Sequence, residues 1–113
     1  EINVDPEQMQ QVFLNIMLNA LQSMQGEGTL TIATYFMPNR DEVDIAFSDT
    51  GKGIEEDAIK NIFKPFFTTR HTGTGLGLAI SRNIIERHNG KIIVDSRIGI
   101  GSTFHVILKA HSS

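Results

Sequence analysis

A carboxylate ends an alternating apolar segment of the chain. Asp49 continues the two-residue spacing of Val43, Ile45 and Phe47. Side chains two residues apart on a strand share a face, so Asp49 is expected to point into the core. An ionised carboxylate accepts hydrogen bonds and cannot donate, so it would take the exocyclic amine of adenine and reject the carbonyl of guanine. The alternative is a loop carboxylate that caps the next short helix or closes an Asp-Thr-Gly turn.

Two asparagines lie one helical turn apart in an otherwise apolar segment. Asn15 and Asn19 therefore share one edge of a helix, and Gln22 lies on the same edge. They are either polar residues at the rim of an amphipathic helix or amides that need partners. In the second case their oxygens are suitable hard ligands for Mg²⁺.

A glycine-rich segment, Gly73–Leu78, precedes a predicted helix. Free N–H groups at a helix start bind phosphate, and glycines let the phosphate approach the backbone. The segment lacks the Gly-Lys-Ser/Thr run of a Walker loop, and it follows a loop where the dinucleotide motif would follow a strand. The alternative is a flexible turn.

Aromatic, hydroxyl and cationic residues stand just before those glycines, in residues 63–71. They suit a lid over a triphosphate, with Lys64 and Arg70 as phosphate contacts, or a hydrophobic hook that ties a loop to the core. Both are expected, with Phe63, Phe66 and Phe67 as packing. Thr103 could reach an adenine nitrogen, or it could belong only to a hairpin bend.

The elements that must position these residues follow from periodicity. Asp5-Pro6 predicts a helix start, and the apolar spacing that follows predicts a helix that is largely buried. The further expected elements are the strands Thr29–Phe36, Val43–Asp49, Lys91–Asp95 and Thr103–Lys109 and the helices Glu55–Phe63 and Leu76–His88. This order predicts an α+β fold, a two-layer sandwich with a mixed sheet of about four to five strands covered on one face by about three helices.

Length and composition exclude several kinds of protein. The 113 residues fit one domain, and the absence of cysteine excludes a disulfide framework or a thiolate metal site. A net charge of −3 argues against a nucleic-acid binder. No apolar run approaches the ~20 residues of a membrane span, and nothing indicates export.

Five segments together resemble the boxes of the ATPase superfamily that includes histidine kinases, type II topoisomerases, a heat-shock chaperone and mismatch-repair ATPases. The match is to the catalytic domain of bacterial sensor histidine kinases. The segments resemble the N box, first glycine box, F box, second glycine box and last glycine box, at residues 11–20, 49–54, 63–67, 73–78 and 99–104. They occur in the family order, and the short lid is similar to that of nitrogen-regulation-type kinases.

The resemblance implies a Bergerat-type fold that binds Mg²⁺-ATP and leaves ADP. Asp49 would contact adenine, and Asn19 together with Asn15 would hold Mg²⁺. Asn15, Lys64 and Arg70 are the expected catalytic residues. The expected nucleotide contacts are Asn15, Asn19, Asp49, Gly51, Gly53, Ile54, Lys64, Gly73, Thr74, Gly75, Leu76, Gly77, Leu78 and Thr103.

Two positions differ from related sequences: Gln22 from many histidine kinases, and Asn15 from the hydrolytic branches of the superfamily. Gln22 stands where many members carry a lysine, so Lys64 or Arg70 would replace that phosphate contact. Asn15 stands where the hydrolytic branches usually place a glutamate that activates water. An amide cannot act as a general base, so Asn15 favours phosphoryl transfer over hydrolysis.

The same resemblance implies partners that are not encoded in these residues. None of the four histidines has the context of a phosphoacceptor. The chain is expected to be a monomeric, cytoplasmic catalytic segment of a dimeric kinase, with a separate dimerisation domain carrying the histidine and a response regulator acting indirectly. The alternatives are a nucleotide-gated switch, and an ATPase or serine kinase of the same superfamily.

Overall fold

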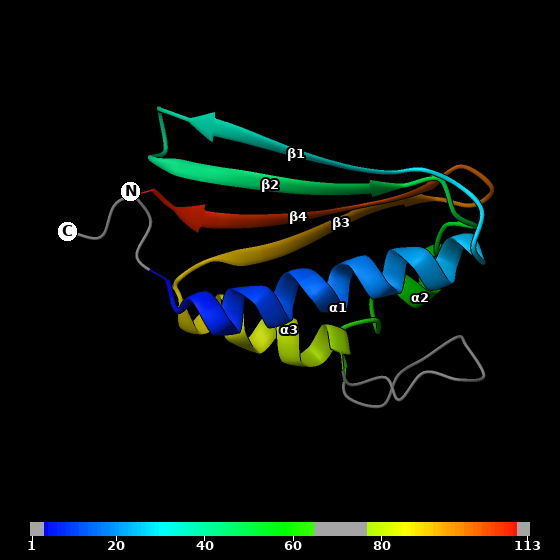
Figure 1. Ribbon diagram of the computed structural model, residues 1–113, viewed down its shortest axis with the longest axis horizontal. Helices are drawn as coiled ribbons and strands as arrows, with labels where there is room; N and C mark the ends of the chain where they lie inside the picture. The colour runs from blue at the N-terminus through cyan, green and yellow to red at the C-terminus, as the bar shows by residue number, and fades with distance from the viewer. Residues whose placement is uncertain (1–3, 65–76, 111–113) are drawn as a thin grey trace.

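The computed structural model describes residues 4–64 and 77–110, and its order of elements is close to the predicted one. Figure 1 shows a sheet above two long helices. The elements are α1 (Pro6–Met24), β1 (Leu30–Met37), β2 (Glu42–Asp49), α2 (Glu56–Ile59), α3 (Gly77–Arg87), β3 (Lys91–Arg97) and β4 (Gly101–Lys109). Helix α2 is shorter than the predicted helix Glu55–Phe63.

The start of α1 is confirmed as predicted. Asp5 is the N-cap, and its side chain accepts the backbone N–H groups of Glu7 and Gln8 at 2.9 and 3.3 Å. Pro6 occupies the first turn, where its missing N–H costs nothing. The cap therefore fixes where the helix begins and, with it, the position of every residue on its faces.

The sheet has the order β1-β2-β4-β3, and every pairing among the described strands is antiparallel. The expectation of a mixed sheet is therefore wrong for these strands. Both β2 and β3 run antiparallel to β4, so they share a direction. Since β4 lies between them, the crossover through the helices creates no parallel pair.

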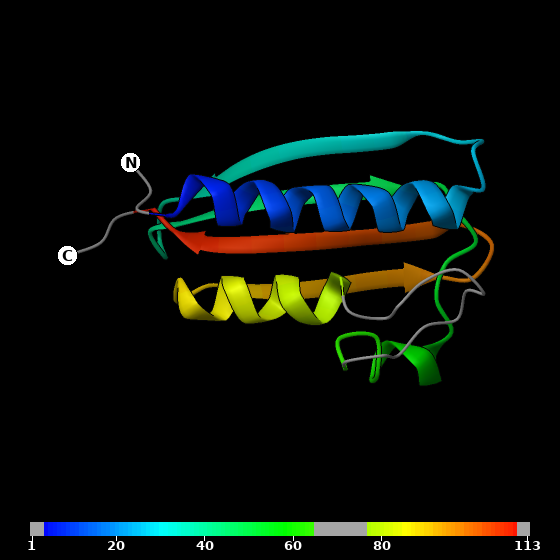
Figure 2. The same cartoon turned by 60° about the horizontal axis from the view of Figure 1, so that its bottom comes forward.

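One face of the sheet is covered by α1 and α3, which lie side by side in Figure 2. The α+β sandwich is thus confirmed, with two long helices on that face and the short α2 at the end of the molecule where β2 ends (Figures 1 and 2). Between the layers lies one core, in which the most deeply buried large side chains are Phe104, Ile16, Ile85, Val12 and Val106. This burial fixes both helices against the sheet.

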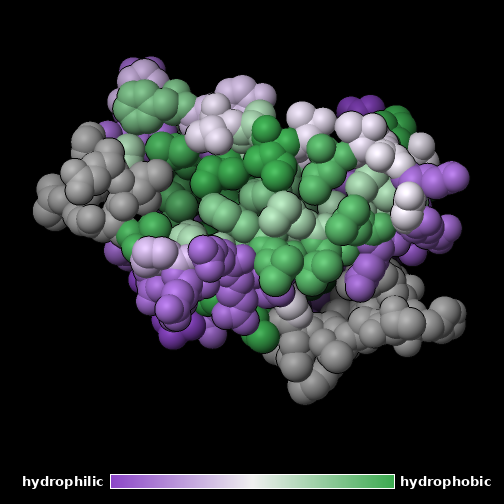
Figure 3. Space-filling model, viewed as in Figure 1, coloured by the Kyte–Doolittle hydropathy of each residue, from purple (hydrophilic) through white to green (hydrophobic). Residues whose placement is uncertain are grey.

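Helix α1 is less buried than its sequence predicts. Its buried residues are Met9, Val12, Ile16, Ala20 and Met24. Leu14, Leu18 and Leu21 are 53%, 45% and 51% exposed, because the sheet and α3 cover only part of the helix surface. Ile32 and Phe36 of β1 are also exposed, and Figure 3 shows an apolar area at the centre of this view of the molecule.

Candidate nucleotide-binding site

Asp49 is buried at the end of β2, on the face that the helices cover. Asp49 is only 6% exposed, and it lies opposite Ser102 in the pairing of β2 with β4. The backbone N–H groups of Gly51 and Ser102 donate to Oδ1 at 2.9 and 3.3 Å. No donor to Oδ2 accompanies them among the described residues, so that oxygen can accept a hydrogen bond from a ligand.

The two alternatives for Asp49 are thereby partly reconciled. Its bond to the Gly51 N–H closes the predicted turn, but α2 is capped by Glu55 without a side-chain hydrogen bond. The carboxylate is also buried on the core face, as alternation predicts. Because the turn holds Oδ1, the protein also fixes the direction of Oδ2. A fixed acceptor favours selective binding of a ligand.

The glycine turn after β2 is packed tightly between α1 and the β3–β4 hairpin. A Cβ on Gly51 would overlap Ser23, and a Cβ on Gly53 would overlap the carbonyl oxygen of Arg97. The Lys52 carbonyl accepts the Gly99 N–H at 2.8 Å. Gly51 and Gly53 thus have a packing requirement of their own, beyond any contact with a nucleotide.

Two serine hydroxyls gather beside this turn that the sequence analysis did not single out. Ser102 is 4% exposed, and its Oγ lies 2.7 Å from the Oγ of Ser96. Ser96 also accepts the Ile54 N–H at 2.7 Å. Ile54 itself is partly buried and packs against the core. Alternation from Phe104 would have identified Ser102, because residues 102 and 104 share a face.

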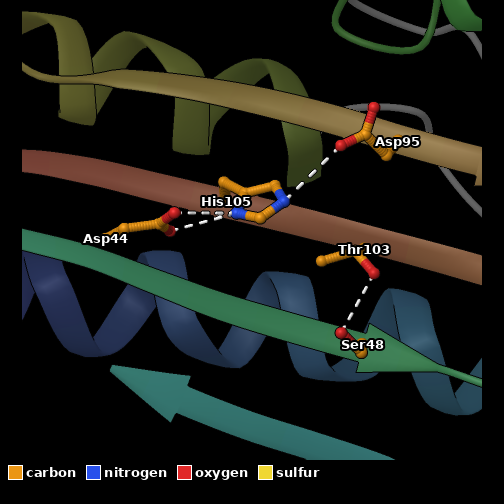
Figure 4. Close-up of polar contacts among 5 residues, drawn as sticks. All are labelled: Asp44, Ser48, Asp95, Thr103 and His105. Atoms are coloured by element: carbon orange, nitrogen blue, oxygen red, sulfur yellow. Dashed lines mark hydrogen bonds and ion pairs between the residues drawn. The ribbon is translucent and has the colours of Figure 1, made fainter. Parts of the chain in front are cut away.

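Thr103 does not join this group of side chains. It pairs with Ser48 across the strands, and its Oγ1 lies 3.0 Å from the Ser48 Oγ on the face without helices (Figure 4). Successive strand residues point to opposite faces, so the residue that accompanies Asp49 is Ser102. The predicted Thr103 contact with adenine therefore has no support from the side-chain positions.

Asn15 links α1 to the first turn of α3. Its Nδ2 donates to the Gly77 carbonyl at 3.2 Å and to the Ser81 Oγ at 3.3 Å. Ser81 is fully buried and donates to the same carbonyl at 2.8 Å. The amide nitrogen is thus engaged, which leaves the oxygen of Asn15 as its atom for a cation. Asn19 lies one turn further along α1 and is partly buried.

The predicted phosphate-binding residues are described only in part. Gly77 and Leu78 lie in the first turn of α3, where N–H groups have no partner within the helix. Gly73, Thr74, Gly75 and Leu76, like Phe66, Phe67 and Arg70, lie outside the described residues. Lys64 is exposed. The ring of Phe63 packs edge-on against that of Phe104, with 6.4 Å between the ring centroids, which confirms the expected packing role of Phe63.

The two histidines of the described residues, His88 and His105, each form hydrogen bonds to other protein groups. His88 Nδ1 lies 2.8 Å from the Ile84 carbonyl, and its Nε2 accepts the Asp5 N–H at 3.2 Å. His105 lies between Asp44 and Asp95 on the helix-free face (Figure 4), with Nδ1 3.0 Å from Asp44 Oδ2. No group of three possible metal ligands occurs among residues 4–64 and 77–110.

The fold is a two-layer α+β sandwich, and its buried carboxylate Asp49 lies beside the packed glycine turn. The chain belongs to the family of histidine kinase-, DNA gyrase B-, and HSP90-like ATPases, whose pattern matches residues 4–112. The resemblance inferred from the five boxes is thus confirmed for the family.

Individual relatives are sensor kinases. The chain is 45% identical over 104 residues to the sensor histidine kinase ZraS of Escherichia coli, covering 92% of this chain and 22% of that protein. It is 42% identical over 107 residues to sporulation kinase E of Bacillus subtilis, covering 95% and 14%. It therefore spans less than a quarter of either relative. The similarity to ZraS is compatible with the nitrogen-regulation-type subgroup.

A solved structure has the same fold. The nucleotide-free catalytic domain of histidine kinase ThkA superposes with a TM-score of 0.84 at 34% identity, covering 96% of this chain and 70% of that one. No helix of the described residues is long and apolar enough to cross a membrane. The solved structure of ThkA therefore supports the fold class, and the sequence relatives support the kinase relationship.

Proposed function

We propose that this chain binds Mg²⁺-ATP and directs the γ-phosphoryl group to a histidine on a separate dimerisation domain. The observation that carries the proposal is the Asp49 carboxylate, buried on the helix-covered face with Oδ1 held by two backbone N–H groups. These two donors both go to Oδ1, so Oδ2 is available to accept the exocyclic amine of adenine.

Adenine selection is the role of the buried end of the site. Asp49 accepts the exocyclic amine, and the neighbouring Ser102 hydroxyl offers a second polar contact on the same face. The backbone of the turn at Gly51 and Gly53 would line the base-binding site. Its packing against Ser23 and Arg97 holds the turn in place. Guanine is rejected because its carbonyl would face a carboxylate.

Phosphate and metal binding belong to the α1–α3 side. The N–H groups at the start of α3 would bind the phosphates, and Asn15 holds that turn against α1. Asn19 supplies an amide oxygen to Mg²⁺, with the Asn15 oxygen beside it on the same helix edge. Bound Mg²⁺-ATP supplies the phosphoryl group and neutralises its charge.

Transfer rather than hydrolysis is the proposed outcome. Asn15 has its amide nitrogen engaged by Gly77 and Ser81, and an amide has no basic lone pair to activate water. Lys64 and Arg70 are proposed to stabilise the γ-phosphate. The histidine acceptor, and a response regulator after it, belong to other parts of a cytoplasmic two-component pathway.

A phosphotransfer assay tests this proposal. The chain is mixed with γ-labelled ATP, Mg²⁺ and the histidine-bearing dimerisation domain of ZraS, a relative 45% identical to it. We expect label on that domain, no label when its histidine is replaced by alanine, and little free phosphate. Rapid release of phosphate without labelling would contradict transfer and assign the domain to the hydrolytic branches.

A further inference from the structure

Ser96, in β3, lies at a junction of two backbone segments that border Asp49. Its Oγ accepts the Ile54 N–H at 2.7 Å, donates to the Gly101 carbonyl at 3.2 Å and lies 2.7 Å from the Ser102 Oγ. Ile54 ends the glycine turn after β2, and Gly101 and Ser102 are the first two residues of β4. One hydroxyl therefore joins the glycine turn to β4 at the buried end of the site.

The hydrogen-bonding capacity of Ser96 is fully used by these contacts. A hydroxyl has one proton and two acceptor positions. The Ile54 N–H can only donate and the Gly101 carbonyl can only accept, so the Ser96 proton is available to Gly101 while Ile54 fills one acceptor position. The second acceptor position then takes the Ser102 hydroxyl proton. In this arrangement Ser102 keeps its own lone pairs for a ligand.

The connection from Ser96 to Asp49 is short. Ser102 is bonded to Ser96 through its side chain and to Asp49 Oδ1 through its backbone N–H at 3.3 Å. From the other side, Ser96 holds Ile54, which follows the turn that supplies the Gly51 N–H to the same oxygen. Both donors that orient Asp49 thus belong to segments that Ser96 anchors.

We propose that Ser96 is a positioning residue that sets adenine affinity without touching the nucleotide, by holding the Gly51–Ile54 turn and Ser102 around Asp49. This inference rests on the proposed adenine-binding role of Asp49. Packing alone does not replace the hydroxyl, because its loss leaves the partly buried Ile54 N–H and the Gly101 carbonyl without this partner.

The test compares Ser96→Ala with Ser48→Ala. Ser48 is a matched control, because it also makes a hydroxyl–hydroxyl bond to β4, at 3.0 Å to Thr103, but on the opposite face of the same sheet. We expect Ser96→Ala to weaken ATP and ADP binding by about fivefold or more in calorimetry and to narrow the preference for ATP over GTP. Ser48→Ala should leave that preference within about twofold of wild type.

A second pair isolates the hydroxyl if the alanine variant folds poorly. Ser96→Thr and Ser96→Val have nearly the same shape, and only threonine keeps the hydroxyl. Threonine should retain the preference for ATP over GTP, and valine should narrow it as alanine does. If Ser96→Ala and Ser96→Val both kept the wild-type preference for ATP over GTP, the inference about Ser96 would be overturned and the proposed role of Asp49 would stand. A wild-type chain that binds ATP and GTP equally would overturn the proposed function of Asp49, and the inference with it.

Discussion

Asp49 illustrates how a single side chain can be prepared for a ligand by backbone groups. Two N–H groups hold Oδ1, and the residue is 6% exposed. In the proposed role, the carboxylate is oriented before the adenine base binds, so little conformational entropy would be lost on binding. Asn15 is prepared in a similar way, because its amide nitrogen is bonded to the first turn of α3.

Replacing the carboxylate of Asp49 should change base selection. Asp49→Asn presents both a donor and an acceptor, so we expect ATP binding to weaken by at least ~1.5 kcal/mol while the fold is kept. Asp95→Asn removes the same charge from an exposed residue on the helix-free face and serves as the control. Calorimetry with ATP and GTP provides the measurement, and equal affinities of wild type for the two would contradict the adenine assignment.

Replacing Asn19 should separate metal binding from base binding. Asn19→Leu removes the amide oxygen, so we expect it to abolish the increase in ATP affinity that Mg²⁺ provides. Asn19→Asp keeps a hard oxygen ligand and should retain part of that increase. Titration of each variant with ATP in Mg²⁺ and in EDTA measures the increment, and an unchanged increment in Asn19→Leu would assign the metal to other residues.

At the scale of elements, the site depends on close backbone contact between the glycine turn and the β3–β4 hairpin. Gly53 has a φ of +79°, and its Cα faces the carbonyl oxygen of Arg97. Gly99, on the hairpin itself, has a φ of +80° with no atom within 4 Å of an added Cβ. The two glycines share a left-handed backbone conformation, which would strain a residue with a side chain, but they differ in the space around them.

This difference makes a paired stability prediction. Gly99→Ala should lower the free energy of unfolding only by the cost of a left-handed alanine, about 1 kcal/mol. Gly53→Ala carries the same strain and must also displace the Arg97 backbone, which adds about 1–3 kcal/mol. Denaturant unfolding measures both variants. Equal losses would mean that the turn and the hairpin are not in close contact in solution.

At the scale of the whole molecule, the two faces of the sheet have different roles. The helix-covered face carries Asp49, Ser96 and Ser102 beside the core. The other face carries a polar cluster in which His105 bonds both carboxylate oxygens of the buried Asp44, at 3.0 and 3.1 Å. That cluster lies on the face opposite Asp49, so its contribution should be to stability.

A double-mutant cycle can measure this division. Asp44→Ala and His105→Ala should each reduce stability, and their coupling energy should be about 1–2 kcal/mol, because removal of either partner leaves the other without its bond. ATP affinity should stay unchanged in each variant that remains folded. A coupling below about 0.3 kcal/mol would mean that the bond contributes nothing, and lowered ATP affinity would link the two faces.

The amino-acid sequence by itself determined the local features of this protein. Alternation placed Asp49 on the core face, Asp5-Pro6 started α1, and the five boxes identified the family, because each of these signals spans only a few neighbouring residues. The same alternation, applied from Phe104, selects Ser102 over Thr103 as the neighbour of Asp49. The strand pattern itself therefore favoured Ser102, although Thr103 was the residue predicted to contact adenine.

Only the tertiary structure decided which distant residues meet. The bond between Ser96 and Ile54 joins positions 42 apart, and the bond between Asn15 and Gly77 joins positions 62 apart. The antiparallel order of the strands and the exposure of Leu18 likewise depend on which elements pack together. Such contacts leave no periodic signal in the chain, because they are set by strand register and by the packing of helices on a shared core.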